Sequence, residues 1–475
     1  MITRSEATPR PLRLLLPACL LLLASGRAAL AEGPITDARE PWTLDEALGL
    51  PERLSLSVDH RTRYEYLDNQ FRAGRPGNDQ ILAIRTRVRA RFRFTDWLSV
   101  GVEFQDSRAY LHDGNTPVGT GLVNAAELLR AYLELSFDGP FGGSHHAQLG
   151  RLTMDIGSRR LVARNRFRNT SNAFTGLDWS WHGDGERELR AFYALPVQRL
   201  PNEAEGLRDN DVEFDDESSD FQFWGLFYGD ELLWGDTAEL YAFGIHERAT
   251  YDSTDGDTTP RRRLGTPGFR LLREPREGRL DYEIETALQF GSSQSSLAGS
   301  RTLDHFAHFH HVTLGYTFSR PGSPRLLLHY DYASGDDDPT DGSNERFDTL
   351  FGARRFEFGP TSIYGAFSRS NINTPGIRLQ LKPGTRWSAF VDYRAVWLAS
   401  DRDEWAGTGV QDPTGGSSSF VGQQIELRVR WRPLPGNVLV EFGYAHLFAG
   451  EFIDDAPNSN GGDTNYAYSQ LVLEF

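Results

Sequence analysis

The sequence has very little cysteine and lysine, and each shortage excludes a class of chemistry. Cys19 is the only cysteine, and it lies in an N-terminal segment that we expect to be removed. The mature chain then has no disulfide, no catalytic thiol and no cysteine-based metal site. Lys382 is the only lysine among 50 basic residues, so nearly every cation is a guanidinium, which stays protonated and can bind a carboxylate through two parallel hydrogen bonds.

Recognisable catalytic motifs are also missing. The sequence contains no G-x-S-x-G nucleophile elbow and no H-E-x-x-H zinc motif, and its serine, histidine and acidic residues are too scattered to assign catalytic groups. We therefore expect that the protein is not an enzyme and requires no cofactor.

The net charge excludes another class of partner. The formal net charge is −16, and removal of residues 1–31 would leave a charge near −19, because that segment contains four arginines and one glutamate. An excess of negative charge of this size argues against nucleic acid as a partner.

The N-terminal segment predicts secretion. Basic residues come first, an apolar run follows from 14 to 24, and small residues lead to Ala31, which is the pattern of a cleaved signal peptide over residues 1–31. A membrane anchor would need about 20 apolar residues, and Pro17 interrupts this run. A lipoprotein signal is disfavoured because Cys19 lies inside the apolar run rather than after it.

After a periplasmic leader at residues 32–52, the sequence becomes a series of runs in which apolar and polar residues alternate. A period of two predicts strands whose two faces meet different surroundings. In the run 82–94, one face carries Leu82, Ile84, Thr86, Val88, Ala90, Phe92 and Phe94. The other face carries Ala83, Arg85, Arg87, Arg89, Arg91 and Arg93.

Similar runs extend to the end of the chain. The strong ones fall at residues 54–66, 82–94, 97–106, 127–137, 187–197, 219–228, 237–248, 279–290, 305–318, 324–333, 385–399, 422–432, 437–448 and 466–475. Weaker ones fall at 146–152, 176–182, 264–272, 346–357 and 376–382. We expect 18 strands, within a range of 16 to 20.

Alternation alone would also suit a soluble β-sandwich, but three features favour a transmembrane barrel. Many runs reach ten or more residues, the length that a tilted strand needs to cross a bilayer. Tight connections alternate with long polar ones, such as 198–218 and 400–419. The chain ends on Phe475 after an alternating run, which is typical of outer-membrane barrels. We therefore predict an all-β fold, with residues 32–475 forming a single antiparallel transmembrane β-barrel in the bacterial outer membrane, in contact with its lipid and monomeric.

The charged faces predict the lining of the lumen. Arginines on alternate positions from 85 to 93 would form a ladder about 26 Å long, at about 3.3 Å per residue. Arg61 and Arg63 lie on the neighbouring strand, so this wall is expected to be basic. Asp281, Glu283 and Glu285 are expected to form an acidic wall about half way round. Either these charges pair across strands and rigidify the barrel, or the arginines form a path for an anionic solute that bears carboxylates.

Several segments of the mature chain resemble the alginate-export family of outer-membrane β-barrels. The similar segments are Arg61–Asp68, Asn78-Asp79-Gln80, Gly150-Arg151, Arg159-Arg160-Leu161, Arg168-Asn169-Thr170, Phe174-x-Gly176, Tyr330–Gly342 and Phe347-Asp348-x-Leu350-Phe351. The resemblance implies an 18-stranded barrel that exports a uronic-acid polysaccharide through an arginine-lined constriction gated by loops, with a periplasmic export scaffold as a partner. By matching position it implies these pore cations: Arg61, Arg63, Arg85, Arg87, Arg151, Arg160 and Arg168.

Two other functions remain open at this stage. A porin for small carboxylates would show the same arginine ladder, and a nonspecific diffusion pore is a third interpretation. The width of the lumen and the position of the loops distinguish them, and neither can be determined from the sequence.

Two segments suggest metal ions. The acidic loop from Gly335 to Asp348 is too densely charged to face lipid, so we expect it outside the membrane, and Asp336, Asp337, Asp338 and Asp341 are candidate Ca²⁺ ligands. A loop that is merely solvated would look the same. The cluster from His305 to His311 has no counterpart in the family pattern, and His308 and His310 share one face and could hold a metal.

Overall fold

The computed structural model describes residues 41–139, 142–232, 235–248, 250–251, 258–259, 261–294 and 301–475. The signal peptide expected at residues 1–31 lies outside the described residues. Of the leader, the structure describes residues 41–52, which contain the short helix α2 (Leu44–Leu48). This helix begins at Thr43, whose side chain accepts a hydrogen bond from the backbone N–H of Glu46, and it ends at Gly49, which adopts the left-handed conformation.

Eighteen long strands form the wall of the molecule. They are β1 (Leu54–Asp68), β2 (Asp79–Arg93), β3 (Leu98–Tyr110), β4 (Asn124–Asp138), β5 (Ser144–Leu152), β6 (Phe174–His182), β7 (Glu188–Gln198), β9 (Phe221–Glu231), β10 (Asp236–Glu247), β13 (Arg262–Arg273), β14 (Leu280–Gln294), β15 (Thr302–Thr317), β16 (Arg325–Ala333), β18 (Ile372–Leu381), β19 (Trp387–Trp397), β20 (Phe420–Leu434), β21 (Val438–Ala449) and β22 (Thr464–Glu474).

The remaining described elements are short and lie in connections. They are β8 (Asp216–Glu217), β11 (Thr250–Tyr251), β12 (Thr258–Thr259), β17 (Ser343–Asn344), α3 (Ala204–Asp209), α4 (Arg355–Phe358) and α5 (Glu451–Asp455). Among the residues that the structure describes, no helix has the length and apolar character needed to cross a membrane.

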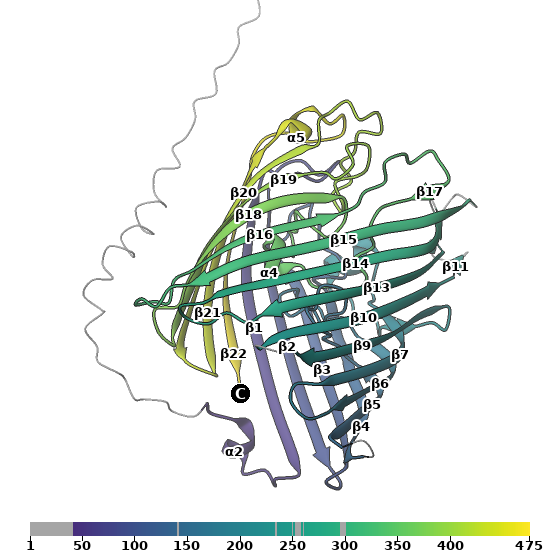
Figure 1. Cartoon of the computed structure of the whole chain (residues 1–475). Helices are drawn as coiled ribbons and strands as arrows, with labels where there is room; N and C mark the ends of the chain where they lie inside the picture. Colours follow the sequence, from purple (N-terminus) through teal and green to yellow (C-terminus); the bar gives the residue numbers. More distant parts are fainter. Residues whose placement is uncertain are drawn as a thin grey trace, which may run out of the picture. The chain divides into compact units, whose positions relative to one another are not determined.

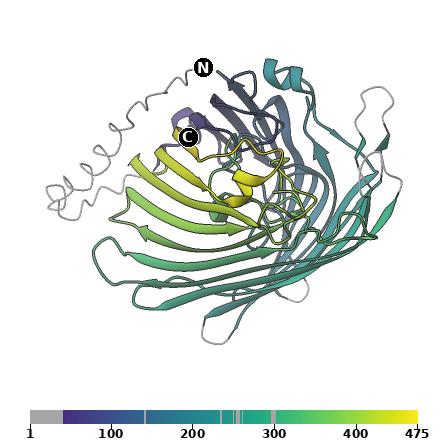
Figure 2. The same cartoon turned by 90° about the horizontal axis from the view of Figure 1, so that it is seen from above.

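The 18 long strands pair antiparallel in chain order and close into a barrel (Figures 1 and 2). The first and last strands close it, with a register that runs from Asp59 opposite Glu474 to Asp68 opposite Asn465. Closure leaves no strand edge without backbone partners, which is the condition for a β-structure to cross a bilayer. The expected fold class and the expected 18 strands are confirmed.

One of the weaker predicted strands is wrong. Residues 346–357 alternate in sequence, but they belong to the long connection between β16 and β18, where Phe347 and Phe358 are buried and residues 355–358 form α4. A period of two is therefore not sufficient to predict a strand when the side chains on both faces are enclosed inside the barrel.

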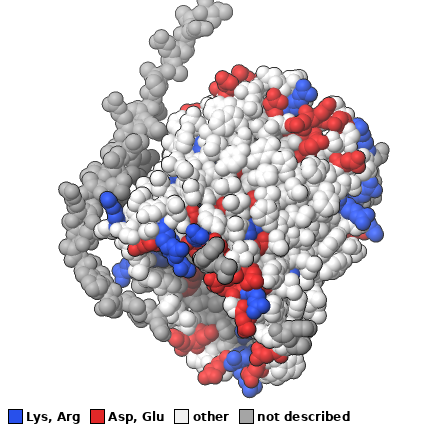
Figure 3. All heavy atoms as spheres, viewed as in Figure 1, with Lys and Arg blue, Asp and Glu red and all other residues white. Residues whose placement is uncertain are grey.

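The two faces of the wall differ as the alternation predicts. On β2, Arg85 and Arg87 are buried on the inner face, whereas Val88 and Phe92 are exposed on the outer face. Figure 3 shows a broad outer surface almost without charged side chains, with charged clusters toward its edges. The interior is polar to an unusual degree, because Arg63, Arg369 and Arg394 are among the largest fully buried side chains.

The two ends of the barrel also differ. The end that holds the C-terminus has tight turns, such as residues 94–97 and 435–437, and we call it the short-turn end. The opposite end, the long-loop end, has extended connections, among them 153–173 and 334–371. These two connections determine what the interior can do.

Candidate functional site: the barrel interior

The connections 153–173 and 334–371 fold into the barrel and contact each other. The backbone N–H of Ala163 donates to the carbonyl of Phe351 (3.1 Å), and the N–H of Phe351 donates to the carbonyl of Leu161 (2.9 Å). Buried apolar side chains, including Val162 and Ile363, hold them in place. We call residues 153–173 the first inner loop and residues 334–371 the second inner loop.

Three of the predicted pore arginines hold the first inner loop to the wall. The Arg61 guanidinium donates to the carbonyl of Phe167 (2.8 Å) and to the side-chain oxygen of Asn169 (3.0 Å). Arg63 donates to the same Phe167 carbonyl (2.7 Å) and lies over the Phe167 ring. Arg85 donates to the Arg168 carbonyl (3.1 Å). All three are buried, and Arg63 also pairs with Glu65 (2.6 Å), so these guanidiniums are occupied by partners within the protein.

The arginines of the ladder from Arg87 to Arg91 form ion pairs with carboxylates. Arg87 and Arg89 both contact Asp59 and Glu103, with Nε of Arg87 2.8 Å from Asp59 Oδ2 and Nε of Arg89 3.1 Å from Glu103 Oε1. Arg91 pairs with Glu134, and Arg93 lies exposed near the short-turn end, where it donates to the carbonyl of Glu52 (3.5 Å). Similarly, Arg151 pairs with Glu127 and Glu217 (both 2.6 Å).

The predicted acidic wall is neutralised from the interior. Arg160 of the first inner loop forms ion pairs with Glu283, Glu285 and Glu357, so it joins β14 to the second inner loop. Asp281 pairs with Arg325 on β16. The structure thus places the residues Asp281, Glu283 and Glu285 on one wall, as expected, but it does not leave them as a free acidic surface.

Helix α4 is fixed at the centre of this network. Glu357 pairs with both Arg160 and Arg369, and the backbone carbonyl of Glu357 accepts a hydrogen bond from Arg394 on β19 (2.5 Å). Arg378 on β18 donates to the carbonyl of Phe356 (2.9 Å). Inward-facing guanidiniums therefore satisfy carbonyls at the end of a helix that is too short to be stable alone.

A cavity of about 370 Å³ lies between the two inner loops, and arginines dominate its charged lining. Its lining includes Arg168, Arg199, Arg354, Arg369, Asn165, Asn172, Thr349, Thr361, Ser362 and Ser368. Arg168 and Arg199 both donate to the side-chain oxygen of Asn172, and neither forms an ion pair with a described carboxylate. Within the described part of the chain, the Arg354 guanidinium forms no ion pair or hydrogen bond.

The guanidiniums of Arg168 and Arg354 lie close to other arginines and form no ion pair with a described carboxylate, whereas Asp215 partly offsets the charge of Arg199. Burial, together with the neighbouring Arg199 and Arg354, lowers the pKa of Arg168, and burial together with Arg369 lowers the pKa of Arg354 to about 10. Buried cations without carboxylates are costly, and a bound anion would relieve that cost. We call Arg168, Arg199 and Arg354 the free arginine cluster.

A second cavity, of about 590 Å³, adjoins the first. The two cavities share Thr349, Arg354 and Ser368, so Arg354 lies between them. The second cavity has mixed charge, because Arg262 pairs with Glu247 and Asp348. It extends toward the long-loop ends of β10, β13 and β14.

The structure does not bring the four candidate calcium ligands together. The Asp338 carboxylate accepts from Thr340 (2.6 Å) and the Asp341 carboxylate from Ser343 (2.8 Å), as in ordinary polar turns. Asp336 lies beside Asp403, and burial, Glu345 and Asp403 raise the pKa of Asp336 to about 7. Asp337 does not gather with the other three into a possible metal site. The whole segment belongs to the second inner loop at the long-loop end.

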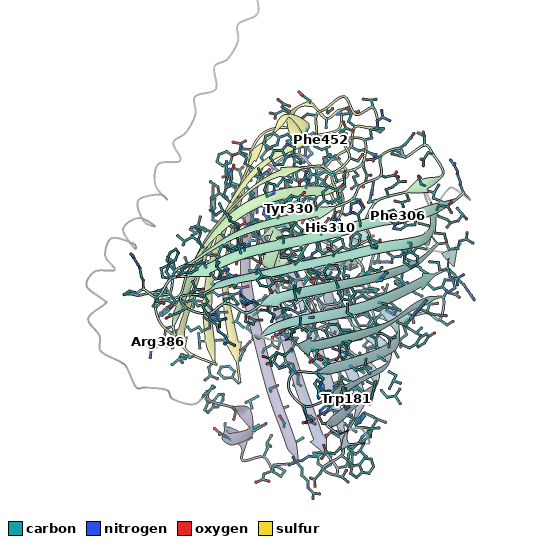
Figure 4. The ribbon with its side chains drawn as sticks, viewed as in Figure 1. Trp181, Phe306, His310, Tyr330, Arg386 and Phe452 are labelled. Carbon is teal, nitrogen blue, oxygen red and sulfur yellow. The ribbon has the colours of Figure 1, made fainter. Side chains whose placement is uncertain are left out.

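The histidine cluster divides between the two faces of β15. His305 contacts Gln289 (3.1 Å) and His311 contacts Asp331 (2.6 Å) inside the barrel. His308 and His310 face outward and contact each other (3.0 Å), as the position of His310 in Figure 4 illustrates. Among the described residues, one group could gather around a metal ion, namely His311, Asp331 and Glu357. Because Glu357 already pairs with two arginines, ion pairing accounts for this group.

Sequence analysis missed two members of the free arginine cluster. Arg199 and Arg354 lie in connections, where no periodic pattern indicates which side chains point inward. Arg168 was expected from the family resemblance alone. For Arg168, a signal in the sequence itself was the arginine content of the segment 159–168, which has no strand periodicity.

Comparison with known families decides which class of barrel this is. The family described as alginate export matches residues 52–467. The chain belongs to this family. Together with the closed barrel, this membership makes the protein an outer-membrane channel for anionic solutes, so that the short-turn end is periplasmic and the long-loop end is extracellular.

Solved structures with the same fold include outer-membrane channels at low sequence identity. OccAB1 of Acinetobacter baumannii has a TM-score of 0.57 at 13% identity, with 89% of this chain and 97% of that chain covered. OccK9 (OpdG) of Pseudomonas aeruginosa also has a TM-score of 0.57 at 13% identity, with 89% and 98% covered. Identities this low show the shared barrel and nothing finer. No curated protein sequence matches this alginate-export family member.

Proposed function

We propose that the protein exports an alginate-like uronic-acid polysaccharide. The carboxylates of this polymer pass the free arginine cluster between the two inner loops. The observation that carries the proposal is the free arginine cluster in the first cavity, whose three half-buried side chains form no ion pair with a described carboxylate. Guanidinium groups match carboxylates in charge and geometry, and in a site that excludes water they replace lost hydration.

The neighbouring polar groups suit a sugar as well as a carboxylate. Asn165, Ser362 and Ser368 line the same cavity and can donate to or accept from hydroxyl groups. Arg354 and Ser368 line both cavities, so a polysaccharide chain that leaves the first cavity enters the second without crossing an apolar barrier. Two adjoining spaces suit successive units of a polymer. A periplasmic export scaffold would deliver such a polymer.

The size of the first cavity favours a second candidate, a porin for small carboxylates. A volume of about 370 Å³ falls within the usual range for small-molecule sites, about 300–1,000 Å³. In that case one carboxylate would occupy the free arginine cluster, and the inner loops would not need to move apart. A polymer would require at least one inner loop to shift.

Current blockade in planar bilayers distinguishes the two candidates. Oligouronates of increasing length should block chloride current at decreasing concentration if a polymer path exists, because each further unit adds a contact. A monomeric uronate that blocks as well as the oligomers would instead support the small-carboxylate porin.

A matched pair of variants tests the cluster itself. Arg168→Gln with Arg354→Gln should weaken the blockade by roughly tenfold or more, since two charge-assisted contacts are lost. Arg166→Gln provides the control, because Arg166 lies in the same inner loop but its side chain is 70% exposed and pairs with Asp155. Equal blockade in the double variant and the control would exclude the cluster as the solute site.

A further inference from the structure

The periplasmic rim carries a group of cations that the interior does not use. Arg320 lies in the turn between β15 and β16, Lys382 and Arg386 lie in the turn between β18 and β19, and Arg432 lies near the end of β20. These segments contact one another, because the N–H of Lys382 donates to the Gly322 carbonyl and the N–H of Arg432 donates to the Arg386 carbonyl (both 2.8 Å). We call these four cations the rim patch.

The rim patch has no internal neutralisation. None of its four side chains forms an ion pair or a hydrogen bond with another described residue. The segments 318–324, 382–388 and 431–437 contain no aspartate or glutamate. The turn between β13 and β14 beside it differs, since it holds Glu274 and Glu277 as well as its arginines, and Glu277 accepts a hydrogen bond from Ser323 at the edge of the patch.

Strand alternation directs most of the patch toward the mouth rather than toward lipid. Arg386 and Arg432 continue the inward-facing rows of β19 and β20, which include the buried Asp392 and Glu426. The next residues, Trp387 and Trp431, belong to the outward rows, where their rings stack 5.6 Å apart and are 44% and 39% exposed. The tryptophans therefore occupy the lipid interface, and Figure 4 shows Arg386 beyond the ends of the strands.

The opposite mouth includes an acidic segment. The extracellular second inner loop carries Asp337, Asp338 and Asp341, which are half-buried or exposed. An anion that approaches the rim patch from the periplasm meets free guanidinium and ammonium groups, whereas one that approaches this acidic segment from outside meets carboxylates. Such a difference in local potential changes association rates much more than affinities.

The geometry points to a capture site for the anionic solute on the periplasmic rim, formed by Arg320, Lys382, Arg386 and Arg432. The inference rests on the proposed function and gives it a direction, because the site raises the rate at which a carboxylate-bearing chain enters from the periplasm. The chain then passes from the rim patch toward the free arginine cluster.

Single-channel blockade from each side tests the capture site. A short oligouronate is added to one compartment at a time, and the rate of blocking events is measured at low and high salt. The rate from the periplasmic side should exceed the rate from the extracellular side by about tenfold at low salt, and the ratio should fall as salt screens the patch. The side must be assigned independently of the blocking rates. Because Lys382 is the only lysine, a change in open-channel conductance after an impermeant amine-acylating reagent is added to one compartment identifies that compartment as periplasmic, with Lys382→Gln as the control for the N-terminal amine.

Paired variants separate the patch from general charge effects. Arg386→Gln with Arg432→Gln should lower the blocking rate from the periplasmic side and leave the extracellular rate unchanged. Arg276→Gln with Arg279→Gln removes two exposed arginines from the neighbouring turn that also contains glutamates, and it should change neither rate. Equal rates from both sides of the unmodified channel, or an equal loss in the control, would overturn the inference.

The experiment also separates this inference from its premise and from a lipid site. Failure of the proposed function appears as no length-dependent blockade from either side, whereas failure of the capture site appears as blockade without asymmetry. Phosphatidylglycerol in the periplasmic leaflet provides the test for a lipid site. If this lipid lowers the blocking rate of the unmodified channel to that of the Arg386→Gln, Arg432→Gln variant, lipid headgroups occupy the patch and the inference is wrong.

Discussion

At the scale of single residues, the role of a buried arginine in this protein depends on its partner. Arg61, Arg63 and Arg85 donate to backbone carbonyls of the first inner loop, whereas Arg168 and Arg354 have no carboxylate partner. Both kinds are positively charged, but the first kind is fully buried and the second is half-buried beside a cavity. The first kind stabilises a loop, and the second kind is available to a solute.

Arg61 gives the most direct test of the stabilising role. Arg61→Gln should release the first inner loop from β1 and lower the free energy of unfolding by about 1.5–3 kcal/mol, the usual value for a hydrogen bond to a charged group. Urea unfolding in lipid measures this loss, and protease cleavage within residues 153–173 should become faster. Arg166→Gln, whose side chain is exposed, is the control, and an unchanged cleavage rate in Arg61→Gln would contradict the stabilising role.

Asp215 predicts a dependence on pH in the connection between β7 and β9. Burial and the nearby Glu127 raise the pKa of Asp215 to about 7, whereas Arg199 and hydrogen bonds from Leu200 and Asn124 oppose the shift. Because the folded pKa is above the unfolded value of 3.8, the folded state holds the proton more tightly. Stability from this group is therefore present at low pH and is lost as pH rises through about 7.

Hydrogen exchange checks that sign. Backbone amides of residues 199–215 should exchange faster at pH 8 than at pH 5, after correction for the intrinsic rate, because an ionised Asp215 is repelled by Glu127. Asp215→Asn should remove the difference. Faster corrected exchange at the lower pH would show that the shift has the opposite direction.

At the scale of elements, the strands could be predicted from the sequence and the inner loops could not. Alternation identified every long strand because one face of each meets lipid and the other meets a polar lumen. The same criterion failed at 346–357, where α4 is enclosed on all sides. Alternation located Glu283 and the family resemblance located Arg160, but neither predicted their contact, since pairing across the lumen has no signature along the chain.

Helix α4 should depend on Glu357. Glu357→Gln removes the carboxylate that Arg160 and Arg369 share. Breaking a buried ion pair in this way lowers the free energy of unfolding by about 3–5 kcal/mol. The shift in the urea midpoint measures this cost. In the Glu357→Gln background, Arg369→Met should restore part of the stability because it removes an unpaired charge, and a purely additive loss would contradict the coupling.

Strand β22 depends on Phe475, the residue that follows it. The N–H of Phe475 donates to the Val58 carbonyl, the N–H of Val58 donates to the Phe475 carbonyl (both 2.9 Å), and the Phe475 ring meets Trp42 at 5.1 Å. Deletion of Phe475 should therefore slow barrel closure and lower the yield of assembled protein in the outer membrane. Phe475→Leu, which keeps both backbone hydrogen bonds, should assemble better than the deletion, and equal yields would assign the effect to the ring instead.

At the scale of the whole molecule, closure of the sheet determines stability. Every long strand has two neighbours, so unfolding must break many backbone hydrogen bonds together. The charged interior adds ion pairs that are shielded from solvent, such as that between Arg394 and Asp392.

Cooperative closure predicts resistance to detergent. The folded protein should keep its compact form in SDS at room temperature and should change its electrophoretic mobility after boiling. Circular dichroism of the folded form should show mainly β-structure. A mobility that is identical before and after heating would argue against a closed barrel in solution.

The contacts of the first inner loop have a mechanical consequence for the barrel. Arg61 attaches this loop to β1, and Arg160 attaches it to β14 on another part of the wall. The loop thus joins two separate parts of the wall and resists a change in the distance between them. Any movement of the loop that widens the path must release one of these attachments, so opening of the channel and a change in its cross-section are coupled.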